Sequence, residues 1–416
     1  MSRPMKKQMI LGENAFFSMD SKQTQLNNNV MIFGATGTGK TTSIVGPNIL
    51  QSYGSYVVSD AKGVLFQKYG KYLEQKGYEV KKLDFTNPSD SSRFNFFNYI
   101  ESEEDIVKIS NMIMFSEDIG SIDRFWYDSS ALLLQSIIAF LMHSPIEKRN
   151  IHEMMKLLDM CDVEENYSEK KSDLDLVFDK LKERYGEEDF AYKSYRRFRI
   201  AAGKTLKSIL ITVNSFLAKY DTQGLNKMLS STDDIDLRNL GKRKMALFVV
   251  TSDTSREMDL IANIFYSIAI NTLCIEANKT KDGALPVHVR FIFDDFSTNV
   301  RINEYPRIIS SVRSRNISCM HMVQTIGQLQ ACYGDDGDTI VGNCDYVVYM
   351  GGSDIPTSQY VSYRANVPLN ISLNLEIAKQ WLFVRGQGPR IIERFDWKNF
   401  EEIKFKENKV KCEEGR

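Results

Sequence analysis

A glycine-rich loop with a lysine and a threonine is the first stretch of the sequence that could bind phosphate. The run Gly34-Ala-Thr-Gly-Thr-Gly39-Lys40-Thr41 satisfies G-x-x-x-x-G-K-[ST] and follows an apolar run that starts at Val30. Glycines let backbone N–H groups turn toward phosphates, and a helix N-terminus favours anions. Lys40 is expected to reach the β- and γ-phosphates of ATP, and Thr41 to place its hydroxyl on Mg²⁺. The residues predicted to contact the nucleotide are Gly34, Thr36, Gly37, Thr38, Gly39, Lys40, Thr41 and Thr42.

Such a site also needs an acid for the metal, and two strand-like runs end in one. The run "YVVSD" ends in Asp60, and "VRFIFDD" ends in Asp294 and Asp295. Adjacent carboxylates can divide the work, because one orients metal-bound water while the other polarises the attacking water. We therefore predict Asp294 as a metal ligand and Asp295 as a catalytic residue. Asp60 is expected at a neighbouring strand end, where a structural and a functional role both remain open.

The order of apolar runs indicates how these residues are positioned. Helical patterns lie between many of the β-rich runs, which predicts an α/β fold with a largely parallel, doubly wound sheet. In the middle of the chain the strand pattern gives way to charged helical segments, which predicts an inserted all-helical domain. We expect a nucleotide-binding domain of residues 1–100 and 230–405, an inserted domain of residues 101–229, and a charged tail of residues 406–416. The expected strands start at Val30, Tyr56, Glu79, Met245, Val289, Ser318, Tyr346 and Trp381.

Bulk composition excludes a global attraction to nucleic acid or to anionic membranes. The 53 Lys and Arg residues balance 54 Asp and Glu residues, so any such contact must be local. Six cysteines are scattered without a C-x-x-C pair, which is typical of the reduced cytosol. The longest apolar stretch, Ala131 to Met142, is well short of the roughly 20 residues that cross a bilayer and is expected to be a buried helix.

The ordered set of motifs resembles that of the conjugative type IV coupling proteins, the TraG/TraD-type ATPases. The resemblance runs nearly end to end, through "NNNVMIFGATGTGKT", "VVSDAKG", "RFNFFNYI", "FWYDSSALLLQSIIAFL", "LRNLGKRKMALFVV", "RFIFDDFSTNVRI", "SRNISCMHMVQTIGQL" and "GNCDYVVYMGG". A phosphate-binding loop alone is common, whereas this series is specific. It implies a RecA-like motor domain with an all-helical domain, homo-hexamers around a channel, and delivery of relaxase-bound single-stranded DNA to the ATPases of a secretion channel.

The resemblance also suggests roles for residues outside the loop and the acids. Gln324 ends the run "HMVQT", where the family has a glutamine motif, and is expected to sense the γ-phosphate; the alternative is a strand-end hydrogen bond. Arg313, in "SVRSRNI", has the spacing of the family's proposed arginine finger, supplied in trans to a neighbouring subunit. Arg364 is the reserve candidate for that role.

Two departures from the family pattern bear on function. Asp295 stands where the family usually has glutamate, so its reach to water is one methylene shorter and slower hydrolysis is expected. The family usually begins with transmembrane helices, and no such segment is evident here. We therefore expect a small membrane protein to anchor the chain at the inner face of the cell membrane through the segment from Met1 to Phe17. The alternative is that this segment packs as an edge of the α/β domain.

The leading hypothesis is a cytoplasmic ATPase that couples hydrolysis to DNA translocation in conjugation. A rival hypothesis is a nucleotide-gated adaptor that recruits relaxase or secreted proteins and moves no DNA, and stimulation of hydrolysis by DNA distinguishes the two. A partitioning or packaging motor is disfavoured by the large helical insertion. The apolar residues of the basic run "AYKSYRRFRIAAGKTLKSIL" have helical spacing. This pattern predicts either a solvated amphipathic helix or a basic patch that binds DNA phosphates.

Overall fold

The computed structural model describes residues 7–114, 124–161, 171–201, 203–230, 232, 234–298 and 300–396. By its internal contacts the chain divides into two compact units. The sheet unit comprises Met1–Lys82, Leu237–Arg256 and Ile270–Arg416, and the helical unit comprises Leu83–Asp236 and Glu257–Ala269. The division into functional domains given above stays a prediction, and the predicted tail 406–416 lies outside the described residues.

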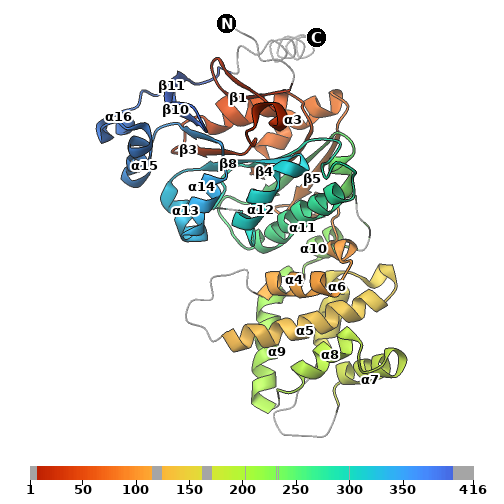
Figure 1. Cartoon of the computed structure of the whole chain (residues 1–416). Helices are drawn as coiled ribbons and strands as arrows, with labels where there is room; N and C mark the ends of the chain where they lie inside the picture. The colour runs from red at the N-terminus through yellow and green to blue at the C-terminus, as the bar shows by residue number, and fades with distance from the viewer. Residues whose placement is uncertain are drawn as a thin grey trace, which may run out of the picture. The chain divides into compact units, whose positions relative to one another are not determined.

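A mostly parallel sheet is the centre of the sheet unit (Figure 1). In the described part of the chain nine strands form it, in the order β11-β10-β9-β3-β8-β7-β4-β6-β5. The strands from β9 through β6 pair in parallel, whereas β10 runs antiparallel to both β9 and β11. The bounds are β3 (Val30–Phe33), β4 (Ser55–Ala61), β5 (Glu79–Asp84), β6 (Met245–Thr251), β7 (Val289–Phe293), β8 (Ile317–Val323), β9 (Tyr346–Tyr349), β10 (Lys379–Val384) and β11 (Arg390–Glu393).

The predicted α/β fold is confirmed, and each of the eight expected strands is present. Every residue of the central strands β3, β6, β7 and β8 is buried, which is why their sequences read as continuous apolar runs. β11 was not predicted from the sequence, because this edge strand is largely exposed and lacks an apolar pattern.

Helices and short helical turns connect the strands of the sheet unit. A π-helical turn, η1 (Thr41–Val45), continues into α2 (Gly46–Leu50) directly after the glycine-rich loop. The helix α11 (Asp259–Asn278) is divided between the two units at Ala269. The other elements are α1 (Ser21–Thr24), α3 (Val64–Gln75), η6 (Leu237–Gly241), α12 (Tyr305–Ser311), η7 (Arg313–Arg315), α13 (Ile326–Tyr333), α14 (Asp336–Gly342), α15 (Ile355–Ala365) and α16 (Leu369–Leu373).

A hairpin near the N-terminus, β1 (Gln8–Gly12) and β2 (Ala15–Ser18), packs on the core of the sheet unit. Met9 and Leu11 are fully buried in a cluster with side chains of β3, β4 and β8. The backbone of Ile10 exchanges hydrogen bonds with the side chain of Asn48, at 3.0 and 2.7 Å. The described part of the predicted anchoring segment therefore packs against its own domain, and residues 1–6 lie outside the described residues. The membrane-anchor partner stays a prediction.

The helical unit is built around α5 (Arg124–His143), which contacts α4, α6, α8 and α9. The helices are α4 (Glu103–Met114), α6 (Ile151–Asp159), α7 (Asp173–Tyr185), α8 (Phe190–Phe198), α9 (Gly203–Leu217) and α10 (Gln223–Met228), with short turns η2 (Pro88–Asp90), η3 (Phe96–Tyr99), η4 (Ile146–Lys148) and η5 (Ala218–Tyr220). By length and composition α5 and α11 could each cross a membrane, yet 50% and 78% of their most apolar windows are buried inside the protein. Such helices also occur as core helices of water-soluble domains.

The basic run from Ala191 to Ile209 folds as two helices, which corrects the interpretation of a single one. Its apolar side chains are buried as expected, Tyr195 and Phe198 on α8 and Leu206 and Ile209 on α9. α8 ends at Phe198, and α9 starts at Gly203, whose φ of +55° is a left-handed conformation that glycine readily adopts.

Candidate functional site

The predicted chemical groups meet at the carboxyl edge of the sheet, because their strands are neighbours. The order β3-β8-β7-β4 places the ends of these strands side by side. Gly34 follows β3, Gln324 follows β8, Asp294 follows β7, and Asp60 is near the end of β4. The N–H of Gly34 donates to the carbonyl of Val323 at 3.1 Å, so the glycine-rich loop starts against the end of β8. Ligands of open α/β sheets bind at this edge.

The glycines of the loop have specific conformational roles. Gly37 and Gly39 have φ values of +80° and +83°, in the left-handed region where residues with a side chain are strained. A side chain at Gly34 would place its Cβ 2.6 Å from Thr38 Oγ1 and 3.1 Å from Cβ of Met350. Glycine at these three positions therefore lets the loop turn tightly without backbone strain or a steric clash, as a phosphate cradle requires.

Lys40 lies inside this loop. Its Nζ donates to the carbonyls of Gly34 at 2.6 Å and Ala35 at 3.2 Å, and only 8% of the residue is exposed. Burial lowers the pKa of the ammonium group, while the charges of Asp295 and Asp294 act in the opposite direction. The loop thus holds a buried cation next to two acids, and incoming phosphate oxygens could replace the two carbonyls as its partners.

Thr41 and Asp294 form the part of the site that fits a metal ion. The Thr41 hydroxyl donates to Oδ2 of Asp294 at 3.1 Å. Burial and the neighbouring charge of Asp295 raise the pKa of Asp294 to about 6, although the hydrogen bond from Thr41 opposes this shift. A hydroxyl and a carboxylate are the hard oxygen donors that Mg²⁺ prefers, and a divalent cation would favour ionised Asp294.

Asp295 occupies a turn directly after the metal-binding candidate. It has a left-handed φ of +58°, which is uncommon for a residue with a side chain. The charge of Asp295 acts on Lys40 and also on Lys62, whose ammonium pairs with Asp253 at 2.7 Å. Its position agrees with a residue that acts on water next to the phosphates, and its role stays a prediction.

Asp60 holds the start of α3, which favours the structural one of the two roles left open by the sequence. Its strand β4 pairs with β7, the strand that ends at the acidic pair. The carboxylate of Asp60 is buried and accepts the N–H groups of Leu65 at 2.9 Å and Phe66 at 2.7 Å, in the first turn of α3. These bonds satisfy donors that a helix start otherwise leaves without a partner.

Gln324 lies at the carboxyl end of β8, between the loop and the acids. Its backbone N–H donates to Oε1 of Gln328 at 3.2 Å, and the Thr325 side chain caps α13 by accepting from the N–H of Gln328. This network fixes the backbone at the strand end. The position agrees with the predicted γ-phosphate sensor, and that role also remains to be tested.

The arginines predicted as fingers make their hydrogen bonds outside the glycine-rich loop of their own chain. Arg313 is in η7, before the amino end of β8, and its guanidinium donates to the carbonyl of Ser21 at 3.4 Å. It is thus at the opposite edge of the sheet from Gln324, across the length of β8. Arg364, on α15, donates to the Tyr360 hydroxyl at 2.9 Å and stacks over the ring of Phe383. A role in trans for either residue remains a prediction.

A different arginine contacts the loop, and the sequence analysis did not identify it. Arg394, just after β11, donates from NH1 to the carbonyl of Thr38 at 2.7 Å and from NH2 to the carbonyl of Met350 at 2.6 Å. No motif points to this residue, because its partners are backbone carbonyls far away in the sequence.

Comparison with known proteins places these features in context. A family model described as type IV secretory system conjugative DNA transfer matches residues 2–365. No curated protein sequence matches the chain.

Solved structures share the fold. The unbound coupling protein TrwBdeltaN70 has a TM-score of 0.68 at 15% sequence identity, over 95% of this chain and 90% of that one. The plasmid coupling protein TrwB in complex with ADP and Mg²⁺ has the same score and identity, over 94% of this chain and 90% of its own. VirB4 of Thermoanaerobacter pseudethanolicus has a TM-score of 0.52 at 12% identity, over 95% of this chain and 98% of its own. These structural similarities, over most of each chain, support a RecA-like fold with an all-helical domain.

Proposed function

The chain belongs to the type IV secretory system conjugative DNA transfer family, and from this premise we propose that it is an ATPase that couples substrate recruitment to DNA transfer. In this function the protein would bind ATP with Mg²⁺, recruit a relaxase bound to single-stranded DNA, and drive that strand to the secretion channel. The observation that carries the proposal is the contact of Thr41 with Asp294 beside a glycine-rich loop that encloses Lys40.

The residues of the loop would bind the phosphates. Backbone N–H groups from Gly34 to Thr42 would surround the phosphate oxygens, and Lys40 would exchange its carbonyl partners for the β- and γ-phosphates. Thr41 and Asp294 would hold Mg²⁺, which neutralises charge on the β- and γ-phosphates when it is bound. TrwB, a protein of the same fold, has been solved in complex with a non-hydrolysable ATP analogue, which supports a nucleotide at this edge of the sheet.

Two side chains would act next to the γ-phosphate. The Asp295 carboxylate would accept a hydrogen bond from this water and orient its oxygen toward the γ-phosphorus. Gln324, at the end of the strand between the loop and the acids, would distinguish the state with a γ-phosphate from the state without it. Developing charge on the transferred phosphoryl group would be stabilised by Lys40 and by an arginine of a neighbouring subunit, for which Arg313 is the first candidate and Arg364 the second.

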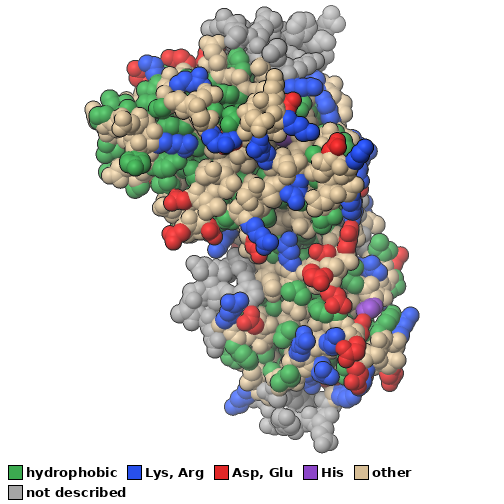
Figure 2. Space-filling view, viewed as in Figure 1, with side chains coloured by type: hydrophobic (Ala, Val, Ile, Leu, Met, Phe, Trp, Pro, Cys, Tyr) green, Lys and Arg blue, Asp and Glu red, His purple; other side chains and the backbone are tan. Residues whose placement is uncertain are grey.

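Assembly into a homo-hexamer is part of the proposal, and an exposed apolar surface supports it. Around α15 and α16 the side chains of Tyr363 and Ile377 are 91% and 87% exposed, and Ile355 and Ile371 are also exposed. Figure 2 shows hydrophobic side chains gathered over this part of the sheet unit. Apolar patches of this kind mark interaction surfaces, so contacts between copies would cover them.

The proposed partners follow from the same function. They are the relaxase with its single-stranded DNA, the ATPases of the secretion channel, and a small membrane protein. The protein would work in the cytoplasm, where ATP is available, and at the inner face of the cell membrane, where the membrane partner would hold it.

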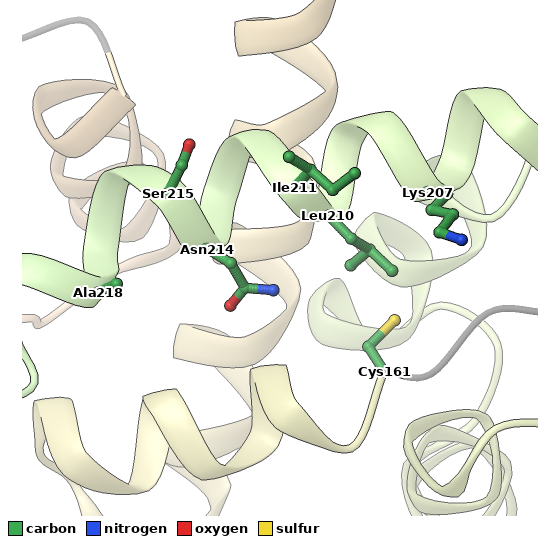
Figure 3. A pocket seen from close by; sticks show the side chains of 7 residues that line it. All are labelled: Cys161, Lys207, Leu210, Ile211, Asn214, Ser215 and Ala218. Atoms are coloured by element: carbon green, nitrogen blue, oxygen red, sulfur yellow. The ribbon is translucent and has the colours of Figure 1, made fainter.

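The nucleotide-gated adaptor remains the second candidate, and a pocket in the helical unit favours it. The pocket has a volume of about 460 Å³. Figure 3 shows Cys161 facing one side of α9, which contributes the other labelled side chains except that of Ala218, the first residue of η5. The lining residues are Cys161, Lys207, Leu210, Ile211, Asn214, Ser215 and Ala218. Ile211 is 60% exposed, so this surface offers an apolar contact beside a lysine, as recruitment of a protein segment would need.

ATP hydrolysis with and without single-stranded DNA tests the proposal. We expect hydrolysis that requires Mg²⁺, rises on addition of single-stranded DNA, and disappears in Lys40→Ala. Hydrolysis that DNA leaves unchanged, combined with nucleotide-dependent binding of relaxase, would instead support the adaptor. A well-folded wild-type protein that binds no nucleotide would refute both candidates.

A further inference from the structure

The guanidinium of Arg394 joins three segments of the sheet unit. NH1 donates to the Thr38 carbonyl in the glycine-rich loop, and NH2 donates to the Met350 carbonyl after β9. Nε donates to the carbonyl of Lys379 on β10 at 3.3 Å. The side chain is partly buried, and burial lowers the pKa of the guanidinium. A planar group with several fixed donors can bridge carbonyls in this way, which a lysine ammonium cannot reproduce.

The bond to Thr38 has a direct consequence for phosphate binding. The peptide unit between Thr38 and Gly39 is planar and trans, so its C=O and N–H groups point in opposite directions. When Arg394 holds the Thr38 carbonyl on one side of the loop, the Gly39 N–H must point to the other side. Gly39, with its φ of +83°, directly precedes Lys40, so this N–H belongs to the predicted phosphate cradle.

Other contacts fix the position of Arg394. The N–H of Glu13, in the N-terminal hairpin, donates to the Glu393 carbonyl at 2.9 Å, and the N–H of Arg394 itself donates to the Ala378 carbonyl at 2.9 Å. The ring of Phe395, the next residue, meets the ring of Phe16 edge to face. The guanidinium is therefore presented to the loop by a backbone that is held on both sides.

The loop is also tied to the segment after β9, where Arg394 makes its second carbonyl contact. The N–H of Ala35 donates to the Gly351 carbonyl at 3.1 Å, and the N–H of Met350 donates to the Phe33 carbonyl at 2.8 Å. Arg394 adds a further link between the two segments, because its guanidinium binds the Thr38 carbonyl of the loop and the Met350 carbonyl after β9. It lies beyond residue 365, where the match to the family model ends.

We propose that Arg394 is a positioning residue of the nucleotide site, which orients the Thr38–Gly39 peptide so that its N–H faces the phosphates. This inference rests on the proposed binding of ATP at the loop. Arg394 has no contact with the reacting atoms in this assignment and acts through the backbone of the loop alone. The residue directly after β11 thereby supports the nucleotide-binding loop.

Nucleotide affinity of Arg394→Ala, measured with a fluorescent ATP analogue and Mg²⁺, tests the proposal. We expect affinity to fall by about tenfold or more, since one charge-assisted hydrogen bond to the loop is lost. Arg394→Lys should recover only part of this affinity, because an ammonium cannot bridge the carbonyls of Thr38 and Met350 in the same geometry. Arg390→Ala is the matched control, because Arg390 is exposed on β11 and its guanidinium bonds to Gln387 instead of the loop; its affinity should equal that of the wild type.

Chemical rescue separates positioning from a general effect on folding. Millimolar guanidinium chloride should restore much of the affinity of Arg394→Ala, whereas the same concentration of sodium chloride should not. Loss of affinity without rescue, accompanied by a lower melting temperature, would overturn the proposal, and so would wild-type affinity in Arg394→Ala. The variant Lys40→Ala separates the proposal that ATP binds at the loop from the proposal that Arg394 positions the loop. If the wild type binds nucleotide and Lys40→Ala does not, an unaffected Arg394→Ala refutes only the role of Arg394.

Discussion

Replacement of Asp294 by asparagine should stabilise the folded protein while it removes Mg²⁺-dependent nucleotide binding. The pKa of Asp294 is raised to about 6 from an ordinary value of 3.8, first by burial and then by the charge of Asp295. At neutral pH the ionised carboxylate therefore destabilises the folded state, and the full shift corresponds to at most about 3 kcal/mol. Because Asp294 is partly exposed, we expect about 1 to 2 kcal/mol. Asparagine keeps the size of the side chain and an oxygen that can accept the hydrogen bond from Thr41.

The pH dependence of this gain has a defined sign. Folded Asp294 keeps its proton to a higher pH than the unfolded chain, so the stability of the wild type falls as pH rises from about 4 to about 6. The advantage of Asp294→Asn should grow over the same interval and level off above it. At pH 5 we expect about half of the gain seen at pH 8, because the unfolded carboxyl group is already largely ionised there.

Urea denaturation at pH 5 and pH 8 measures this difference. Trp381, buried on β10, reports on the sheet unit once Trp126 and Trp397 are replaced by phenylalanine in both proteins. Binding of a fluorescent ATP analogue with and without Mg²⁺ then shows whether the metal dependence is lost. An Asp294→Asn protein that is less stable than wild type at pH 8 would refute the reasoning, because the carboxylate would then be stabilised by an ion pair, with Lys40 as the nearest candidate.

Three further substitutions test the assignments around the loop. Lys40→Ala should abolish hydrolysis and leave the far-ultraviolet circular dichroism unchanged, and normal activity in a folded variant would contradict the phosphate-binding role. Asp295→Asn should lower kcat far more than nucleotide affinity, since this acid is assigned to water; equal losses would make it a metal or structural residue. Asp60→Asn should keep Mg²⁺ affinity near that of the wild type but lose about 1 kcal/mol of stability, because asparagine has only one oxygen to accept from Leu65 and Phe66. Loss of Mg²⁺ affinity in that variant, measured by titration, would show that Asp60 contributes to the metal site.

Local patterns in the sequence determined the fold class and the edge of the sheet that carries the site. Glycines at positions 34, 37 and 39 and the apolar run before them define a strand, a turn and a helix start without any distant contact. Continuous apolar runs identified the buried parallel strands, because such strands are covered on both faces. In the basic run, the helical spacing of the side chains predicted burial correctly but missed the break between α8, which ends at Phe198, and α9, which starts at Gly203.

Only the tertiary structure decided which groups contact one another across the chain. Asp60 and Asp294 both end apolar runs, and their difference lies in their partners: two N–H groups of α3 for one, and the hydroxyl of Thr41, 253 positions away, for the other. Arg394 reaches Thr38 across 356 positions, from an exposed edge strand without a pattern. Its partners are backbone carbonyls, which every residue has. The residue types at Thr38 and Met350 therefore give no sign of the contact in the sequence. Sequence patterns therefore reveal sites whose chemistry lies in side chains at fixed spacing, whereas contacts to distant backbone groups are set by the packing of the strands.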